Sequence, residues 1–296
     1  MQPRNIAVKR VLVPTDFSEI SLHALEYAAH LARIEDAEIV LLHVVESYPQ
    51  NTGLDFRFDL TEIIERGIQD KFREIQQQNP SLAGVRLRSQ VTVGKIYSEI
   101  DRIAAEEQVR LIVMGTHGVS GITNIGKYII GSNAYRTIQN APCPIITLRQ
   151  RPPSFAIRKL LVPLDSTPES TQKIDVAIRW ARYFKAKIQL LAITAFFEEL
   201  VVDVRDVTRR VHEVEKQLNE LGLDYDAHIV RHTAPSESVL EFAEKTQSDL
   251  IIIVTGQESA LSELLFGSSA RNIISESPVP VMSINIKKFR VEELES

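Results

Sequence analysis

An internal duplication constrains the fold of this chain more than any other feature. Segments 9–16, 38–42, 111–113, 131–134 and 142–146 recur in the same order at 159–165, 187–191, 250–253, 267–270 and 278–282. A repeat that preserves order predicts two similar domains, which we place at residues 1–150 and 151–296. The length of 296 residues agrees with two domains of about 150 residues each. The segment 149–158, which contains Pro152-Pro153, is the expected linker.

Short apolar runs alternate with longer amphipathic stretches in each half. In the first half we expect strands at 10–15, 38–45, 86–93, 110–114 and 143–148, and helices that begin after Ser18 and span 60–78, 96–107 and 133–140. The strand runs are almost continuously apolar, which indicates parallel strands covered on both faces. The pattern predicts an α/β protein with two tandem doubly wound domains, each containing a five-stranded parallel sheet. In such a sheet a ligand binds at the carboxyl ends of the strands.

Composition argues against several functional classes. The net charge is −5, and neither half is basic, which disfavours a broad nucleic-acid surface. The longest aliphatic run, Leu250 to Val254, is too short to span a bilayer, and the N-terminus lacks the apolar region of a signal peptide. A single cysteine, Cys143, allows no intrachain disulfide. We therefore expect a cytoplasmic protein that binds neither nucleic acid nor a membrane.

Glycines cluster where the fourth strand of the first half should end. The turn Met114-Gly115-Thr116-His117-Gly118 follows that strand, and Gly131-Ser132-Asn133 opens the next helix. Glycine lets backbone approach a ligand, and a helix start offers unpaired N–H groups and the positive end of a dipole. This combination predicts a phosphate site. Asp16 and Val44 end two further strands at the same edge. Asp16 is favoured as a ligand contact over a helix-capping carboxylate.

These motifs, together with Val13 to Ser18, Leu41 to Val45 and Ala141 to Pro144, resemble the universal stress protein family in its tandem form. The resemblance covers nearly the whole chain. It implies a Rossmann-like fold of the adenine-nucleotide α-hydrolase type that binds ATP or another adenine nucleotide, with Mg²⁺ as a candidate companion. The implied nucleotide-binding residues are Pro14, Thr15, Asp16, Val44, Met114, Gly115, Thr116, His117, Gly118, Lys127, Gly131, Ser132 and Asn133.

The first copy departs from the family's glycine pattern in one place. ATP-binding members have Gly, two residues, Gly, nine residues, and then Gly-Ser or Gly-Thr. Here twelve residues separate Gly118 from Gly131, which is three more than the pattern. A spacing of nine exists from Gly121, but we prefer the first alignment because Gly115 directly follows the strand. The nucleoside end is thus intact, and the longer loop affects only the phosphate end.

The second copy departs further. Gln257 stands where the pattern expects a glycine, so a side chain replaces the open backbone. Glu258, the next residue, would repel a phosphate. We expect this half to bind nucleotide poorly or not at all. The positions that correspond to the first site are Asp165, Ile193, Gly256, Gln257, Gly267 and Ser268.

Several weaker motifs have simpler interpretations. Gly121 to Tyr128 approaches a Walker A motif but has tyrosine at the Mg²⁺-binding position, which leaves Lys127 as a secondary phosphate contact at most. The glycine spacing does not match a dinucleotide-binding fingerprint, so NAD is disfavoured. His117 has no evident carboxylate partner in the sequence, and His43 is interpreted as a buried, hydrogen-bonded histidine. No catalytic residue or metal site is predicted.

Prolines flank the fifth strand of each half and restrict both strands to sheet edges, which must be paired or covered. The family resemblance implies that 144–148 pairs with 280–284 inside one chain; a further homodimer stays open. The expected function is stress-response signalling or protection governed by nucleotide binding. Two alternatives remain: a nucleotide-independent scaffold or chaperone-like protein, and a slow ATP hydrolase.

Overall fold

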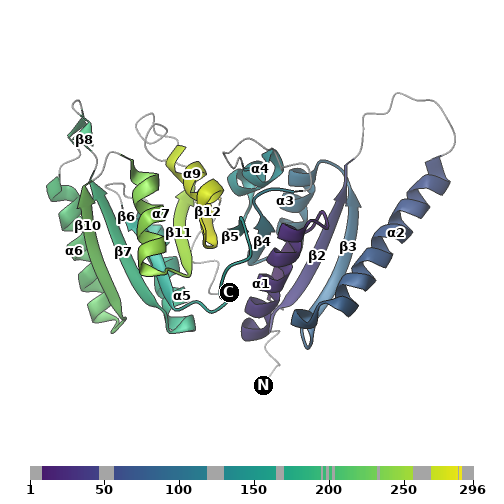
Figure 1. Cartoon of the computed structure of the whole chain (residues 1–296), viewed down its shortest axis with the longest axis horizontal. Coiled ribbons are helices and arrows are strands. Elements are labelled where there is room, and N and C mark those ends of the chain that lie inside the picture. The colour runs from purple at the N-terminus through teal and green to yellow at the C-terminus, as the bar shows by residue number, and fades with distance from the viewer. Residues whose placement is uncertain are drawn as a thin grey trace, which may run out of the picture.

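The structure is a computed structural model that describes residues 9–46, 57–118, 130–164, 170–194, 196–197, 200–201, 204–231, 234–255, 268–285 and 287–288. The two halves lie side by side along one long sheet, with helices packed against it (Figure 1). This layering follows from the sequence, because strands that are apolar on both faces need a helical cover on each side.

The described part of the first half alternates strands with helices, as the sequence predicts. The prolines before β5 delay its start by two residues relative to the prediction, since proline has no N–H to donate to a ladder. The predicted strands 38–45 and 86–93 match β2 and β3 residue for residue. The elements are β1 (Arg10–Pro14), α1 (Glu19–Glu35), β2 (Glu38–Val45), α2 (Arg57–Gln78), β3 (Arg86–Val93), α3 (Ile96–Glu106), β4 (Leu111–Gly115), α4 (Ser132–Asn140) and β5 (Ile145–Leu148).

The second half repeats this order. Its main elements are β6 (Lys159–Leu164), α5 (Ser170–Phe184), β7 (Lys187–Thr194), α6 (Val204–Glu220), β10 (Tyr225–Arg231), α7 (Pro235–Thr246), β11 (Leu250–Thr255), α9 (Ser268–Glu276) and β12 (Val281–Asn285). A small antiparallel pair, β8 (Phe196–Phe197) and β9 (Leu200–Val201), lies between β7 and α6.

The sheet order shows two copies of one topology. The strands run β10-β7-β6-β11-β12-β5-β4-β1-β2-β3, so each half is a five-stranded parallel sheet of order 3-2-1-4-5 read from its outer edge. This confirms the predicted doubly wound α/β fold. In each half the strand order reverses between the first and fourth strands, which is the topological switch point where such folds bind ligands.

The fifth strands join the two halves. β5 and β12 pair antiparallel, with Thr147 opposite Val281 and Ile146 opposite Met282. Side chains beyond each strand then reach the last helix of the other half. Arg149 Nη1 donates to the carbonyl of Glu276 at 2.7 Å, and Lys288 Nζ donates to that of Asn140 at 2.9 Å. Cations at these positions satisfy carbonyls at helix C-termini and face the negative end of each helix dipole.

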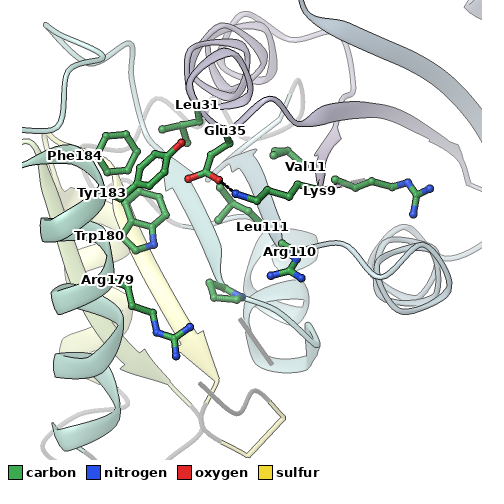
Figure 2. Close-up of a pocket in the computed structure, with 12 residues that line it drawn as sticks. Lys9, Val11, Leu31, Glu35, Arg110, Leu111, Arg179, Trp180, Tyr183 and Phe184 are labelled. Atoms are coloured by element: carbon green, nitrogen blue, oxygen red, sulfur yellow. Dashed lines mark hydrogen bonds and ion pairs between the residues drawn. The ribbon is translucent and has the colours of Figure 1, made fainter. Parts of the chain in front are cut away.

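Helices α1 and α5 meet at the opposite edge of this seam. The hydroxyl of Tyr183 donates to the carbonyl of Ile34 at 2.9 Å and connects the two helix ends. Figure 2 shows Tyr183 beside Trp180 and Phe184 on α5, facing an ion pair between Lys9 and Glu35 from the first half.

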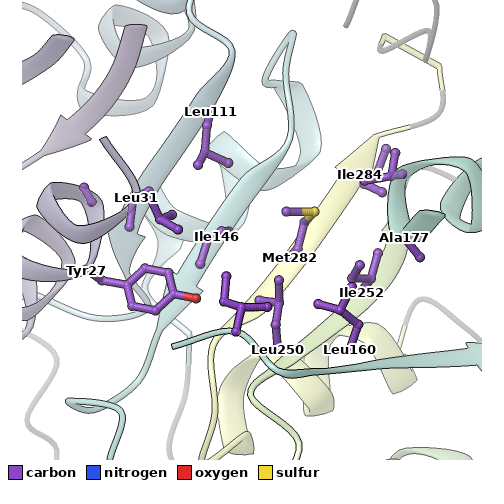
Figure 3. Close-up of a cluster of buried hydrophobic side chains, with 14 of the residues drawn as sticks. Tyr27, Leu31, Leu111, Ile146, Leu160, Ala177, Leu250, Ile252, Met282 and Ile284 are labelled. Carbon is purple, nitrogen blue, oxygen red and sulfur yellow. The ribbon is translucent and has the colours of Figure 1, made fainter. Parts of the chain in front are cut away.

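One hydrophobic cluster crosses the seam. Leu31, Leu111 and Ile146 of the first half belong to the same buried cluster as Leu250 and Met282 of the second (Figure 3). Contact between these side chains removes apolar surface from water, at about 25 cal/mol per Å², so the seam is part of the core.

Candidate functional site

A cavity of about 400 Å³ opens at the carboxyl ends of β1, β2 and β4, where the topology expects a ligand. We call it the carboxyl-end cavity. Twelve of the thirteen residues predicted for the first site line it: Pro14, Thr15, Asp16, Val44, Met114, Gly115, Thr116, His117, Gly118, Gly131, Ser132 and Asn133. The thirteenth, Lys127, lies outside the described residues, as does the rest of 119–129.

Asp16 contacts both the start of α1 and the glycine turn. Its Oδ1 accepts hydrogen bonds from the backbone N–H of Ser18, at 3.0 Å, and from the Ser18 hydroxyl. Ser18 in turn caps α1, accepting from the N–H of Ser21 at 3.4 Å, as the sequence predicts. Oδ2 of Asp16 lies directly against Gly118 at the cavity. Asp16 therefore supports the helix start and also presents an oxygen to the cavity.

The turn that carries Asp16 depends on an unusual backbone conformation. Phe17 has a φ of 63°, the left-handed region that bulky residues rarely adopt. Its ring stacks on His43 with centroids 4.6 Å apart and also contacts Phe72 at 5.6 Å. Its N–H donates to the Thr15 hydroxyl at 3.0 Å. These contacts compensate for the strained φ and hold Asp16 at the cavity mouth.

His43 differs from its sequence-based interpretation in one respect. Its Nδ1 lies 2.8 Å from the carbonyl of Thr15, and a carbonyl only accepts, so Nδ1 carries the proton. The ring is thus hydrogen-bonded as expected. However, it is half-buried and lines the cavity beside Val44, so it belongs to the site.

The glycine turn and the start of α4 are connected directly by backbone. The N–H of Gly131 donates to the carbonyl of Thr116 at 2.8 Å, and the N–H of Thr116 donates to Leu148 at 2.8 Å. Gly131 is the N-cap of α4 and brings the first-turn residues Ser132 and Asn133 to the cavity. The first turn of α4 contains no acidic residue. Its unpaired N–H groups and its dipole favour an anion here.

Gly115 and Gly118 are restricted to glycine for different reasons. A Cβ on Gly115 would lie 3.0 Å from the side chain of Ile20 and 3.2 Å from the carbonyl of His117. A Cβ on Gly118 would overlap Oδ2 of Asp16. Glycine at position 115 lets the end of β4 pack closely on α1. Glycine at position 118 leaves room for the Asp16 carboxylate.

His117 has the wrong environment for a cationic role. Burial lowers its pKa, the positive charge of Arg149 lowers it further, and Asp16 opposes both effects. Nδ1 lies 3.0 Å from the hydroxyl of Thr116. The imidazole is therefore neutral at pH 7 and can exchange hydrogen bonds without adding charge.

The sequence did not predict six of the residues that line the cavity. They are Ser21, Leu42, His43, Ile96, Ile100 and Ala134. Ile96 and Ile100 share one face of α3. The helical pattern of 96–107 predicts an inward face for Ile100 together with Ile103 and Ala104, and it does not distinguish core from cavity. The signal that Ile96 and Ile100 face the cavity appears only when α3 is placed beside the strand ends.

The predicted second site falls mostly outside the described residues, because Asp165, Gly256, Gln257 and Gly267 all lie there. Ile193 is half-buried near the end of β7, and Ser268 is the first residue of α9. Among the residues that the structure describes, no three His, Cys, Asp or Glu side chains form a metal-binding group. None of the described helices is long and apolar enough to cross a membrane.

Comparisons with known proteins agree with this architecture. A family model described as the universal stress protein family matches residues 7–149 and again residues 156–285. Universal stress protein MJ0531 of Methanocaldococcus jannaschii is 30% identical over 145 residues, which are 48% of this chain and 82% of that protein. A universal stress protein structure from Archaeoglobus fulgidus superimposes with a TM-score of 0.74 at 21% identity, covering 93% of this chain and 98% of that one.

Smaller solved structures match one half only. One is a universal stress protein in complex with cAMP, which covers 44% of this chain at 21% identity and a TM-score of 0.36. The family model, in contrast, matches both copies of the repeat, and the sheet shows both copies in the same topology. The chain therefore belongs to the universal stress protein family and contains the family's domain twice.

Proposed function

We propose that the first half, residues 1–150, binds an adenine nucleotide, ATP, in the carboxyl-end cavity. Occupancy of this site would control a signalling or protective role in the cytoplasmic stress response. One observation carries the proposal: residues predicted from three separate sequence segments line a single cavity. Its position at the switch point of the sheet adds support, because doubly wound folds bind ligands there.

The nucleoside end is assigned to the strand ends and α3. The carboxylate of Asp16 accepts from ribose hydroxyls, and backbone at Val44 hydrogen-bonds the adenine edge. Ile96, Ile100 and Met114 supply an apolar wall for the flat base. Pockets for such ligands combine apolar walls with a few directed polar groups, and this lining has that composition.

The phosphate end is assigned to the start of α4. The N–H groups of Ser132 and Asn133, the Ser132 hydroxyl and the helix dipole together favour the negative charge of phosphates. The backbone hydrogen bond from Gly131 to Thr116 supports this assignment, because it brings α4 beside the glycine turn despite the longer loop. Lys127 would add a secondary contact, and Mg²⁺ would accompany the phosphates.

The second half, residues 151–296, is assigned a different role. Gln257 and Glu258 replace open backbone with side chains at its phosphate position, so we propose that it binds nucleotide weakly or not at all. It would act as a built-in partner, held to the first half through the fifth strands. Such pairing makes one chain the equivalent of a dimer.

Calorimetric titration of the intact protein with ATP and Mg²⁺ tests the proposal. Asp16→Asn keeps an oxygen that can accept from Ser18 but removes the charge. Because a hydrogen bond to a charged group contributes about 1.5–3 kcal/mol, we expect the Kd to rise at least roughly tenfold. Asp165→Asn, the same change at the corresponding position of the second half, should leave the Kd unchanged.

Other outcomes would favour the alternatives. No binding at millimolar ATP would reject the proposal and favour a nucleotide-independent scaffold. An equal loss of affinity in Asp16→Asn and Asp165→Asn would reject the assignment of the site to the first half. Phosphate release well above the protein-free background would identify a slow hydrolase instead.

A further inference from the structure

A second cavity lies at the amino ends of the strands, on the opposite edge from the carboxyl-end cavity. Its volume is about 220 Å³, and it lies between α1 and α5, so we call it the α1–α5 cleft. Figure 2 shows its aromatic wall on α5 and its aliphatic floor on β1 and β4. The residues that line it are Lys9, Arg10, Val11, Leu31, Glu35, Arg110, Leu111, Pro144, Arg179, Trp180, Tyr183 and Phe184.

The duplication identifies the equivalent place in the other half. The start of each half aligns at a constant offset of 149 residues: Pro14 with Pro163, and Asp36 with Lys185. Asp36 and Lys185 both follow the first helix of their half with a left-handed backbone, φ 48° and 52°. The same offset aligns Leu31 on α1 with Trp180 on α5. Structure and sequence therefore support one alignment.

On α1 of the first half, which corresponds to α5, the linker covers the equivalent surface. Phe155 contacts Tyr27 and His30 of α1, with ring centroids at 5.8 and 6.0 Å. Ile157 is 4% exposed and belongs to the core cluster that crosses the seam. Arg151 stacks over the Phe155 ring and pairs with Glu26 at 3.0 Å. The segment before β6 thus packs its apolar side chains against the first helix of the opposite half.

At the same offset, the residues that correspond to Phe155-Ala156-Ile157 are Ile6-Ala7-Val8. They share the apolar-small-apolar pattern, and they precede β1 as the linker precedes β6. Val8 directly precedes Lys9 in the sequence, and Lys9 lines the cleft. Residues 6–8 are therefore within reach of the α1–α5 cleft.

We propose that the α1–α5 cleft is the docking site for the chain's own segment Ile6–Val8. At the same offset, Tyr27 and His30, which Phe155 contacts, correspond to Val176 and Arg179 on α5, and Arg179 lines the cleft. The docked segment covers the apolar floor and completes the seam on its amino side.

Trp180 reports on the cleft directly, since it is the only tryptophan in the sequence. In the full-length chain, Ile6→Asp places a charge on an apolar position of the segment. We expect acrylamide quenching of Trp180 to rise roughly twofold, because the cleft that the indole lines loses its occupant. The melting temperature should also fall. Asn5→Asp adds the same charge one residue earlier and should change neither quantity.

Two results would overturn the proposal. One is equal quenching in the Ile6→Asp and Asn5→Asp proteins. The other is an unchanged Trp180 signal after removal of residues 2–8. A cleft that stays open in solution would instead bind the apolar dye anilinonaphthalene sulfonate. If the intact chain binds the dye, and removal of residues 2–8 does not increase that binding, the segment does not occupy the cleft. That result would reject the proposal and assign the cleft to a separate apolar ligand.

Discussion

Gly118 lies directly against the carboxylate of Asp16, so that a methyl group on Gly118 would overlap Oδ2 and lie 3.3 Å from Cγ. These residues are far apart in sequence, on the ends of the first and fourth strands of one parallel sheet. A side chain at position 118 would force the Asp16 carboxylate to rotate away from its present direction. Position 118 therefore controls where the carboxylate points.

Gly118→Ala should weaken nucleotide binding with little loss of stability. The added methyl displaces the end of a short, exposed side chain, so Asp16 can move away without disturbing the packed core. We expect the Kd for ATP to rise about tenfold, which corresponds to roughly 1.4 kcal/mol. Calorimetry measures the Kd, and thermal unfolding measures the stability. Gly67→Ala, on α2, serves as the control with unchanged affinity; loss of affinity there as well would count against a local effect.

Gly67 and Gly84 should respond oppositely to alanine. Gly67 lies inside α2 with open space around its Cβ position, and its backbone is helical. Alanine should raise the free energy of unfolding by about 0.5–1 kcal/mol, because it reduces the freedom of the unfolded chain. Gly84 has a φ of 74°, so alanine there should cost about 1–2 kcal/mol. Urea unfolding of both variants checks the two signs.

Tyr27 places a hydroxyl in the apolar seam, where it has no hydrogen-bond partner among the residues that the structure describes. Its side chain is 1% exposed and belongs to the cluster that joins the halves (Figure 3). Tyr27→Phe removes the unsatisfied group and keeps the ring, so stability should rise by up to about 1 kcal/mol. Tyr27→Ala removes the ring as well and should cost about 3–5 kcal/mol. A marked loss of stability in Tyr27→Phe would show that the hydroxyl is satisfied, for instance by water.

Asp101 on α3 should make stability depend on pH. Burial raises its pKa to about 7, although the charge of Lys288 partly opposes the shift. The folded state therefore holds its proton more tightly than the unfolded state, in which an aspartate titrates near 4. The contribution of Asp101 to the free energy of unfolding is greatest below about pH 4. It decreases as the pH rises from about 4 to about 7, and it stays constant above that pH.

Asp101→Asn should remove this slope. The variant should be more stable than the parent protein above pH 7 and should differ least near pH 4, as measured by urea unfolding across that range. Glu106→Gln changes an exposed carboxylate on the same helix and should retain the slope. An unaltered pH profile in Asp101→Asn would assign the titration to another group.

Several elements followed from local sequence alone. The predicted strands 38–45 and 86–93 match β2 and β3. β2 is an apolar run bounded by polar residues, whereas β3 mixes apolar and polar residues, as suits the strand at the outer edge of the sheet. Ser18 caps α1 as predicted, because a hydroxyl before an apolar helical stripe satisfies the first free N–H groups. The repeat itself predicted two copies of one topology, which the sheet order confirms.

Other features required the assembled structure. The sequence placed His43 in an apolar strand, but its exposure to the cavity depends on Phe17, whose left-handed backbone turns the chain and stacks the two rings. Ile96 and Ile100 have a helical spacing that predicts an inward face without saying whether that face meets core or cavity. The α1–α5 cleft consists of residues from both halves, so neither half alone encodes it.

The sequence by itself determined the repeat, the order of strands and helices, and which residue types gather at the strand ends, because these depend on short-range periodicity and on the rules of parallel sheets. Only the tertiary structure decided that Oδ2 of Asp16 faces Gly118, that α4 begins beside Thr116, and that the Tyr27 hydroxyl in the seam has no partner within the described part of the chain. Those relationships join residues distant in the chain, and their geometry follows from side-chain packing across elements, which no local pattern specifies.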